Sequence, residues 1–79
     1  MQIKVFGTGC ANCKKLLKLT EEAVQELGRQ DEIVYVTELA QIAQAGVMRT
    51  PALMLGGQLK VTGRVPQKDE IKRLISEAE

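Results

Sequence analysis

The sequence predicts an α/β fold with the element order β-α-β-α-β-β-α. Two observations lead to this prediction. Short runs rich in β-branched residues alternate with longer stretches whose apolar residues recur at helical spacing, and glycines separate most of these segments. The chain has 79 residues and shows no internal repeat or linker-like stretch, which is typical of one domain. We therefore expect residues 1–79 to form a single α/β domain.

The first half of the chain predicts a βαβ unit. Residues 2–6 alternate polar and apolar side chains and lead into a glycine-containing turn at 7–9, which indicates a short strand. Apolar positions within residues 11–27 recur on one helical face, and Gly28 follows as a C-terminal stop. Residues 33–36 are mostly β-branched, so we expect a second strand that is parallel to the first and covered on both faces.

A shorter helix is predicted after this unit. Thr37 is expected to cap it, and Gly46 is expected to end it. Its apolar face carries Leu39, Ile42 and Ala43.

The last third of the chain predicts a β-hairpin and a final helix. Residues 52–55 and 58–61 are expected to pair as antiparallel strands, because the Gly56-Gly57 pair between them is a strong hairpin signal. Pro66 suits the first turn of a helix over residues 66–78. The apolar face of this helix carries Ile71, Leu74, Ile75 and Ala78.

Composition and charge exclude several classes of function. There are 11 Lys plus Arg residues against 10 Asp plus Glu, and Phe6 and Tyr35 are the only aromatic residues. Neither a strong field nor a stacking surface for nucleic acid is therefore expected. The segment 1–6 lacks the features of a secretion signal, and no apolar run approaches the roughly 18 residues of a membrane span. We expect a cytoplasmic protein that binds neither nucleic acid nor membrane.

The two cysteines, Cys10 and Cys13, are candidates for redox chemistry. Small secreted domains held together by disulfides usually carry four or more cysteines, whereas this pair would close only a very short loop. Thiols at positions i and i+3 at the start of a helix can form and reopen a disulfide with little backbone movement. The helix N-terminus stabilises a thiolate and lowers a cysteine pKa below its free value of about 8.5.

These positions suggest different roles for the two thiols. Cys10 precedes the helix and is expected to be the nucleophile, with Lys14 and Lys15 adding positive potential or simply remaining solvated. Cys13 begins the apolar stripe and is expected to face inward as the resolving thiol. The alternative is a pair of ordinary buried cysteines.

Thr50-Pro51 is the second candidate feature. A proline at the start of a strand is expected at a turn or a sheet edge, and a cis bond at such a position usually marks function. The sequence leaves both isomers open, and a trans turn proline is the alternative.

Together these features resemble the thioredoxin fold. The resemblance rests on the element order, on Gly-Thr-Gly-Cys-Ala-Asn-Cys at residues 7–13 and on Thr50-Pro51 before a hairpin. More narrowly, the chain is similar to the small redox-active disulfide proteins of archaea and anaerobic bacteria. This resemblance implies a single thioredoxin-like domain over residues 1–79, with a four-stranded mixed sheet flanked by three helices.

The resemblance also implies a site and its partners. It implies a nucleophilic Cys10, a resolving Cys13 that forms a disulfide with it, and a cis Pro51 beside that disulfide. The backbone of Thr50 would pair with the substrate chain, and Gly63 would line the same surface. The implied activity is that of a protein-disulfide reductase or electron carrier without a cofactor. Its implied partners are protein disulfides and a thioredoxin-reductase-like electron donor.

Two other readings of the same thiols stay open. Heavy-metal chaperone domains are of similar length and also place a Cys-x-x-Cys pair after their first strand, where its thiolates bind copper or zinc. Those domains have the order β-α-β-β-α-β, and a structural zinc site would need more ligands than two thiols. The third reading is an adaptor that binds partners beside Thr50-Pro51 without turnover.

Overall fold

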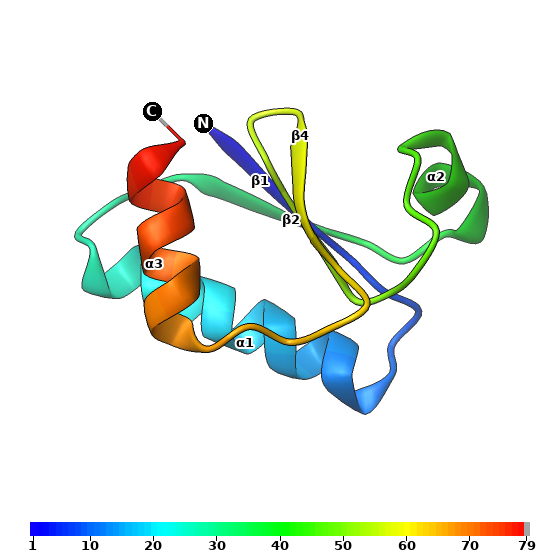
Figure 1. Cartoon of the computed structure of the whole chain (residues 1–79), viewed down its shortest axis with the longest axis horizontal. Helices are drawn as coiled ribbons and strands as arrows, with labels where there is room; N and C mark the ends of the chain where they lie inside the picture. The colour runs from blue at the N-terminus through cyan, green and yellow to red at the C-terminus, as the bar shows by residue number, and fades with distance from the viewer. Residues whose placement is uncertain (79) are drawn as a thin grey trace.

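The computed structural model describes residues 1–78 of the chain. Within this part, four strands and three helices follow one another in the predicted order (Figure 1). Their bounds are β1 (Gln2–Phe6), α1 (Ala11–Glu26), β2 (Glu32–Val36), α2 (Leu39–Gln44), β3 (Ala52–Leu55), β4 (Gln58–Thr62) and α3 (Lys68–Glu77). None of the helices in residues 1–78 is long and apolar enough to cross a membrane.

The strands form one mixed sheet in the order β2-β1-β3-β4. β1 pairs parallel with β2 and antiparallel with β3, and β3 pairs antiparallel with β4. At the β3–β4 turn, Gly56 and Gly57 have positive φ angles of 56° and 86°. Glycine adopts this conformation without the steric cost of a side chain, and it matches the twist of the paired strands. The four-stranded mixed sheet and its hairpin are confirmed.

The prediction that β2 would be covered on both faces is wrong. β2 lies at the edge of the sheet, and its residues Ile33, Val34 and Tyr35 are only half-buried. Val36, at the carboxyl end of β2, is buried in the cluster that contains Ile42 of α2. Because α2 has only six residues, it covers that end of the strand and leaves the rest of the face partly open.

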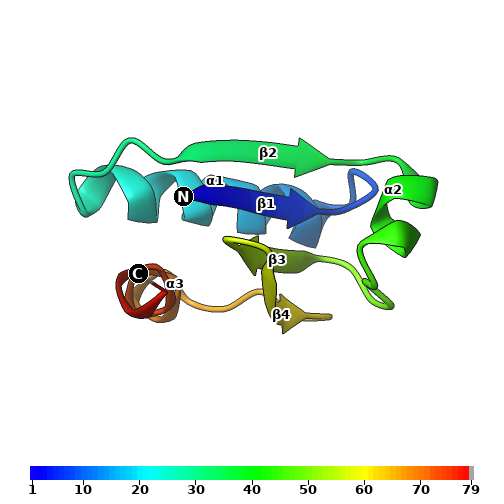
Figure 2. The same cartoon turned by 90° about the horizontal axis from the view of Figure 1, so that it is seen from above.

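The main core lies between the sheet and the helices α1 and α3, which pack against each other (Figure 1, Figure 2). Alternate strand residues point to opposite faces, so Ile3 and Val5 enter this core while Phe6 faces α2. The buried residues of the main core are Ile3, Val5, Leu16, Ala23, Val24, Leu53, Leu55, Val61, Ile71 and Ile75. Those of the smaller cluster are Phe6, Val36, Ile42, Val47 and Ala52.

Two predicted helix starts differ from the structure. α2 begins after Glu38, which makes no side-chain capping bond, so Thr37 is not the cap. α3 begins after Gln67 rather than at Pro66. Pro66 is fully buried, and it therefore serves as a packing residue of the preceding connection instead of opening the helix. Neither difference alters the path of the chain around the cysteines.

Candidate active site

β1 leads into α1 at the carboxyl end of the parallel β1–β2 pair (Figure 2). The two cysteines lie at this junction. Gly9 has a φ of 89°, which permits the tight turn between strand and helix. Cys10 is the N-cap of α1 and has an extended backbone conformation. The turn therefore delivers Cys10 to the amino end of a 16-residue helix.

The sulfur of Cys10 takes the place of a capping oxygen. Cys10 is exposed, and the backbone N–H of Cys13 donates a hydrogen bond to its Sγ atom over 3.1 Å. The carbonyl of Cys10 accepts the bond from the Lys14 amide over 3.0 Å. An amide donor and the positive end of the helix dipole both stabilise negative charge on this sulfur once the disulfide is reduced.

The second sulfur is enclosed. Cys13 is 0% exposed and forms a disulfide with Cys10, with their Cα atoms 5.0 Å apart. Gly7 makes this burial possible, because a Cβ atom at Gly7 would lie 2.5 Å from Cβ and 2.6 Å from Sγ of Cys13. The sequence suggests only a turn at Gly7. Its close approach to Cys13 depends on the folded helix and carries no local signal.

The Thr50-Pro51 segment lies beside the same end of β1. Phe6 pairs with Ala52, so in this antiparallel register Gly7 and Pro51 stand opposite each other. Pro51 is buried, Thr50 is half-buried, and the peptide bond between them is cis. The isomer that the resemblance implies is therefore the one in the structure. The register brings the proline next to the glycine that contacts Cys13.

Gly63, which directly follows β4, lies next to the Thr50-Pro51 segment. Its N–H donates a hydrogen bond to the carbonyl of Pro51 over 2.8 Å, and its φ is 74°. A Cβ atom at Gly63 would lie 3.1 Å from Cδ and 3.3 Å from Cβ of Arg49. The structure thus places Gly63 beside the Thr50-Pro51 segment, and its role in substrate binding stays a prediction. Arg49 is a neighbour of the site that sequence reasoning missed.

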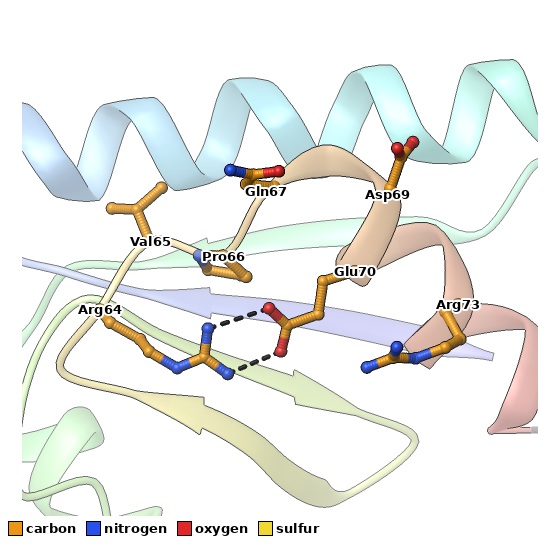
Figure 3. A pocket seen from close by; sticks show the side chains of 7 residues that line it. All are labelled: Arg64, Val65, Pro66, Gln67, Asp69, Glu70 and Arg73. Atoms are coloured by element: carbon orange, nitrogen blue, oxygen red, sulfur yellow. Dashed lines mark hydrogen bonds and ion pairs between the residues drawn. The ribbon is translucent and has the colours of Figure 1, made fainter.

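A separate hollow lies along the connection from β4 to α3 and the first turns of α3, and neither cysteine lines it. It measures about 590 Å³ and is lined by Arg64, Val65, Pro66, Gln67, Asp69, Glu70 and Arg73 (Figure 3). Arg64 donates two hydrogen bonds to Glu70, of 3.0 and 2.6 Å. These bonds raise the pKa of Arg64 and lower the pKa of Glu70. The guanidinium of Arg64 is therefore already neutralised by an internal partner.

The fold and the cysteine geometry together define a class of protein. A disulfide at the start of a helix, with one exposed and one buried sulfur, lies next to a cis-proline segment in an α/β domain with a mixed sheet. Such a pair can alternate between dithiol and disulfide without rearranging the helix. This arrangement is that of a thiol–disulfide oxidoreductase.

Comparison with known proteins identifies the family. Residues 1–76 match the family model described as a thioredoxin domain. The chain is 47% identical over 76 residues to a thioredoxin of Methanothermobacter thermautotrophicus, covering 96% of this chain and 99% of that protein. It is 39% identical over 70 residues to a thioredoxin of Methanocaldococcus jannaschii, covering 89% and 80%. The chain therefore belongs to the thioredoxin family and is a small thioredoxin-like disulfide oxidoreductase.

The family assignment confirms the predicted fold class and redox function. The observed order β-α-β-α-β-β-α places α3 after the last strand, whereas heavy-metal chaperone domains have the order β-α-β-β-α-β. The fold therefore gives no support to the metal-chaperone alternative.

Proposed function

We propose that this chain reduces disulfides in other proteins, with Cys10 as the nucleophile and Cys13 as the resolving thiol. One observation carries the proposal: the two sulfurs of a single disulfide differ sharply in access, because Cys10 is exposed and Cys13 is fully buried. A bulky protein disulfide can approach only an exposed sulfur. The buried thiol can attack only a group that is already attached to its neighbour.

The proposed reaction moves two electrons and two protons to the substrate. The Cys10 thiolate attacks one sulfur of the substrate disulfide, whose S–S bond breaks, and the departing substrate thiolate takes up a proton. Cys13 then loses its proton and attacks Sγ of Cys10. The mixed disulfide breaks, and the second substrate sulfur is released as a thiol. The chain is left with the Cys10–Cys13 disulfide that the structure contains.

Thr50, Pro51 and Gly63 form the proposed substrate platform. In this scheme the backbone of Thr50 pairs with an extended segment of the substrate, as an added strand does at a sheet edge. The hydrogen bond from Gly63 to the carbonyl of Pro51 supports the scheme, because it holds the segment in place. The register that sets Pro51 opposite Gly7 supports it as well, since Gly7 contacts Cys13.

The proposal includes the setting in which the chain works. A thioredoxin-reductase-like donor would return two electrons to the disulfide, and the domain of residues 1–79 would act in the cytoplasm without a cofactor of its own. A content of two cysteines, both used in one reactive pair, supports a compartment in which thiols are kept reduced.

Turnover with a disulfide-bonded protein tests the assigned roles. With dithiothreitol as reductant and insulin as substrate, we expect the wild-type chain to accelerate reduction and the Cys10→Ser variant to give only the rate of dithiothreitol alone. Cys13→Ser is the matched control, because it also lacks the disulfide yet keeps the exposed thiol. It should form a mixed disulfide but turn over poorly. If Cys10→Ser kept the wild-type rate, the proposed roles would be wrong.

A further inference from the structure

Two exposed lysines follow the reactive cysteine. Lys14 and Lys15 lie in the first turns of α1, and the amide of Lys14 bonds to the carbonyl of Cys10, so Lys14 stands one helical turn beyond that residue. Both side chains are exposed and have no ion-pair partner within residues 1–78. Residues 1–20 hold four lysines and no acidic residue.

Arg49 adds a third positive charge at the same end of the sheet. It directly precedes Thr50, it is exposed, and no acidic residue in the described chain pairs with it. Its aliphatic stem lies against Gly63, with Cδ 3.1 Å and Cβ 3.3 Å from where a Cβ of Gly63 would be. Since Gly63 also bonds to Pro51, the stem of Arg49 rests on the segment proposed to hold substrate.

We call Lys14, Lys15 and Arg49 the basic rim. Several cations farther from the cysteines are paired inside the chain: Lys68 and Lys72 contact Glu26, and Arg64 contacts Glu70. The net charge is only +1, so the exposed charge of the rim is a local feature and not an excess over the whole chain. Unpaired charges of one sign around a reactive group attract a partner of the opposite sign.

We propose that the protein substrate of this chain carries acidic residues around its disulfide, and that the basic rim binds their carboxylates. Arg49 can hold a carboxylate through two parallel hydrogen bonds, whereas Lys14 and Lys15 act as point charges that speed the encounter. Met48, next to Arg49 and 93% exposed, offers an apolar contact beside these charges. The proposal rests on the reductase function above and names the class of its substrate.

Two synthetic peptides of equal length, each closed by one disulfide, test this proposal. Glutamates flank the disulfide in one peptide, and lysines replace them in the other. Pre-reduced protein transfers two electrons and two protons to each peptide, and dithiothreitol reduces the protein beforehand. The measured quantity is the ratio of the two second-order rate constants. A change in the reactivity of Cys10 itself cancels in this ratio, because the same thiolate attacks both peptides.

We expect the glutamate peptide to react about tenfold faster or more at low ionic strength, and the ratio to fall toward one in high salt. Lys14→Glu and Arg49→Glu should each lower the ratio. Arg49→Gln should lower the ratio less. Because this variant removes the charge without reversing it, it still tests the role of Arg49 if Arg49→Glu unfolds the chain. Arg73→Glu is the matched control, since Arg73 is an exposed cation on α3 that lies near Glu70 (Figure 3). Lys68 of the same helix contacts Glu22 and Glu26, so α3 lies beside the half of α1 that is far from the cysteines. Arg73→Glu should leave the ratio nearly unchanged.

Several outcomes would overturn the proposal. Equal rates for the two peptides at every salt concentration would show that the rim does not select substrates, while reduction of both would leave the reductase function intact. An equal effect of Arg73→Glu and Arg49→Glu would assign the preference to net charge. Faster reduction of glutathione disulfide than of the glutamate peptide would point to a small anionic substrate. Reduction of neither peptide would refute the reductase function itself.

Discussion

The two ends of the parallel β1–β2 pair differ in how their polar groups are used. At the amino end, Asp31 accepts bonds from Arg29, at 2.5 and 3.2 Å, and from the N-terminal amine of Met1 at 3.2 Å. Gln2 also bonds to Glu32 there. At the carboxyl end lie an exposed sulfur and the unpaired basic rim. One end satisfies its charges internally, and the other presents them to a second molecule.

The same contrast appears in the glycines. At the carboxyl end, Gly7 lies close to Cys13 and Gly63 lies close to Arg49. A side chain on either glycine would push against its neighbour, so both glycines leave room for a residue of the site. Near the amino end, Gly57 has a positive φ, and a Cβ atom there would meet nothing within 4 Å. A glycine can thus allow a positive φ angle without any close neighbour, or it can make room for a nearby side chain. Alanine substitutions distinguish these two roles.

The largest effect is expected from Gly7→Ala. The new Cβ would overlap Cβ and Sγ of Cys13, and neither atom can move far because Cys13 is held in a helix, in the core and in a disulfide. We expect a loss of about 3 kcal/mol or more in the free energy of unfolding, measured with urea. Gly9→Ala is the control. Gly9 has a φ of 89°, which strains any side chain, but a Cβ atom there would meet no atom within 4 Å. A smaller loss for Gly7→Ala than for Gly9→Ala would contradict the packing described.

A middle-sized effect is expected from Gly63→Ala. A side chain at a φ of 74° costs about 1–2 kcal/mol of stability. Gly57→Ala, with a φ of 86°, should cost a similar amount. Only Gly63→Ala displaces Arg49, so only this variant should lower the preference for the glutamate peptide. If both variants, or neither, changed that preference, Gly63 would have no role in placing Arg49.

The smallest effect is expected at the amino end. Asp31→Asn removes the charge that pairs with Arg29 and with the N-terminal amine, and it should cost less than about 1 kcal/mol at neutral pH. The hydrogen bond from Arg29 holds the pKa of Asp31 below its usual 3.8 in the folded chain.

The pH dependence of this effect has a definite sign. A lowered folded pKa gives stability that is fully present above the unfolded pKa and is lost as pH falls through the folded pKa. The difference in stability between wild type and Asp31→Asn should therefore shrink as the pH falls below about 3.8. Denaturation at a series of pH values measures this difference. A constant difference over that range would contradict the assigned ion pair.

Sequence patterns predicted the turns and elements that short stretches of the chain determine. The turn before Cys10, the helix that starts at Ala11 and the hairpin at Gly56-Gly57 all follow from glycine placement and apolar spacing. The apolar stripe also predicted that Cys13 faces inward, but its close approach to Gly7 could not be predicted in this way, because that approach depends on how α1 packs against β1.

Other features were decided by tertiary packing. Pro66 is compatible with a helix start, but burial of its ring places it ahead of the helix. Arg49 and Gly63 meet only because β3 and β4 pair, so no sequence spacing marks their contact. The half-buried state of β2 likewise follows from its position at the sheet edge, which its apolar sequence does not reveal.

The most direct test of the central claim is to identify the cysteine that attacks the substrate. The glutamate peptide is mixed with reduced Cys13→Ser or reduced Cys10→Ser, and intact-mass spectrometry measures the mixed disulfide formed by each variant. The difference in access between the two sulfurs predicts rapid capture through Cys10 in Cys13→Ser and almost none through Cys13 in Cys10→Ser. Equal capture by the two variants, or faster capture by Cys10→Ser, would contradict the account.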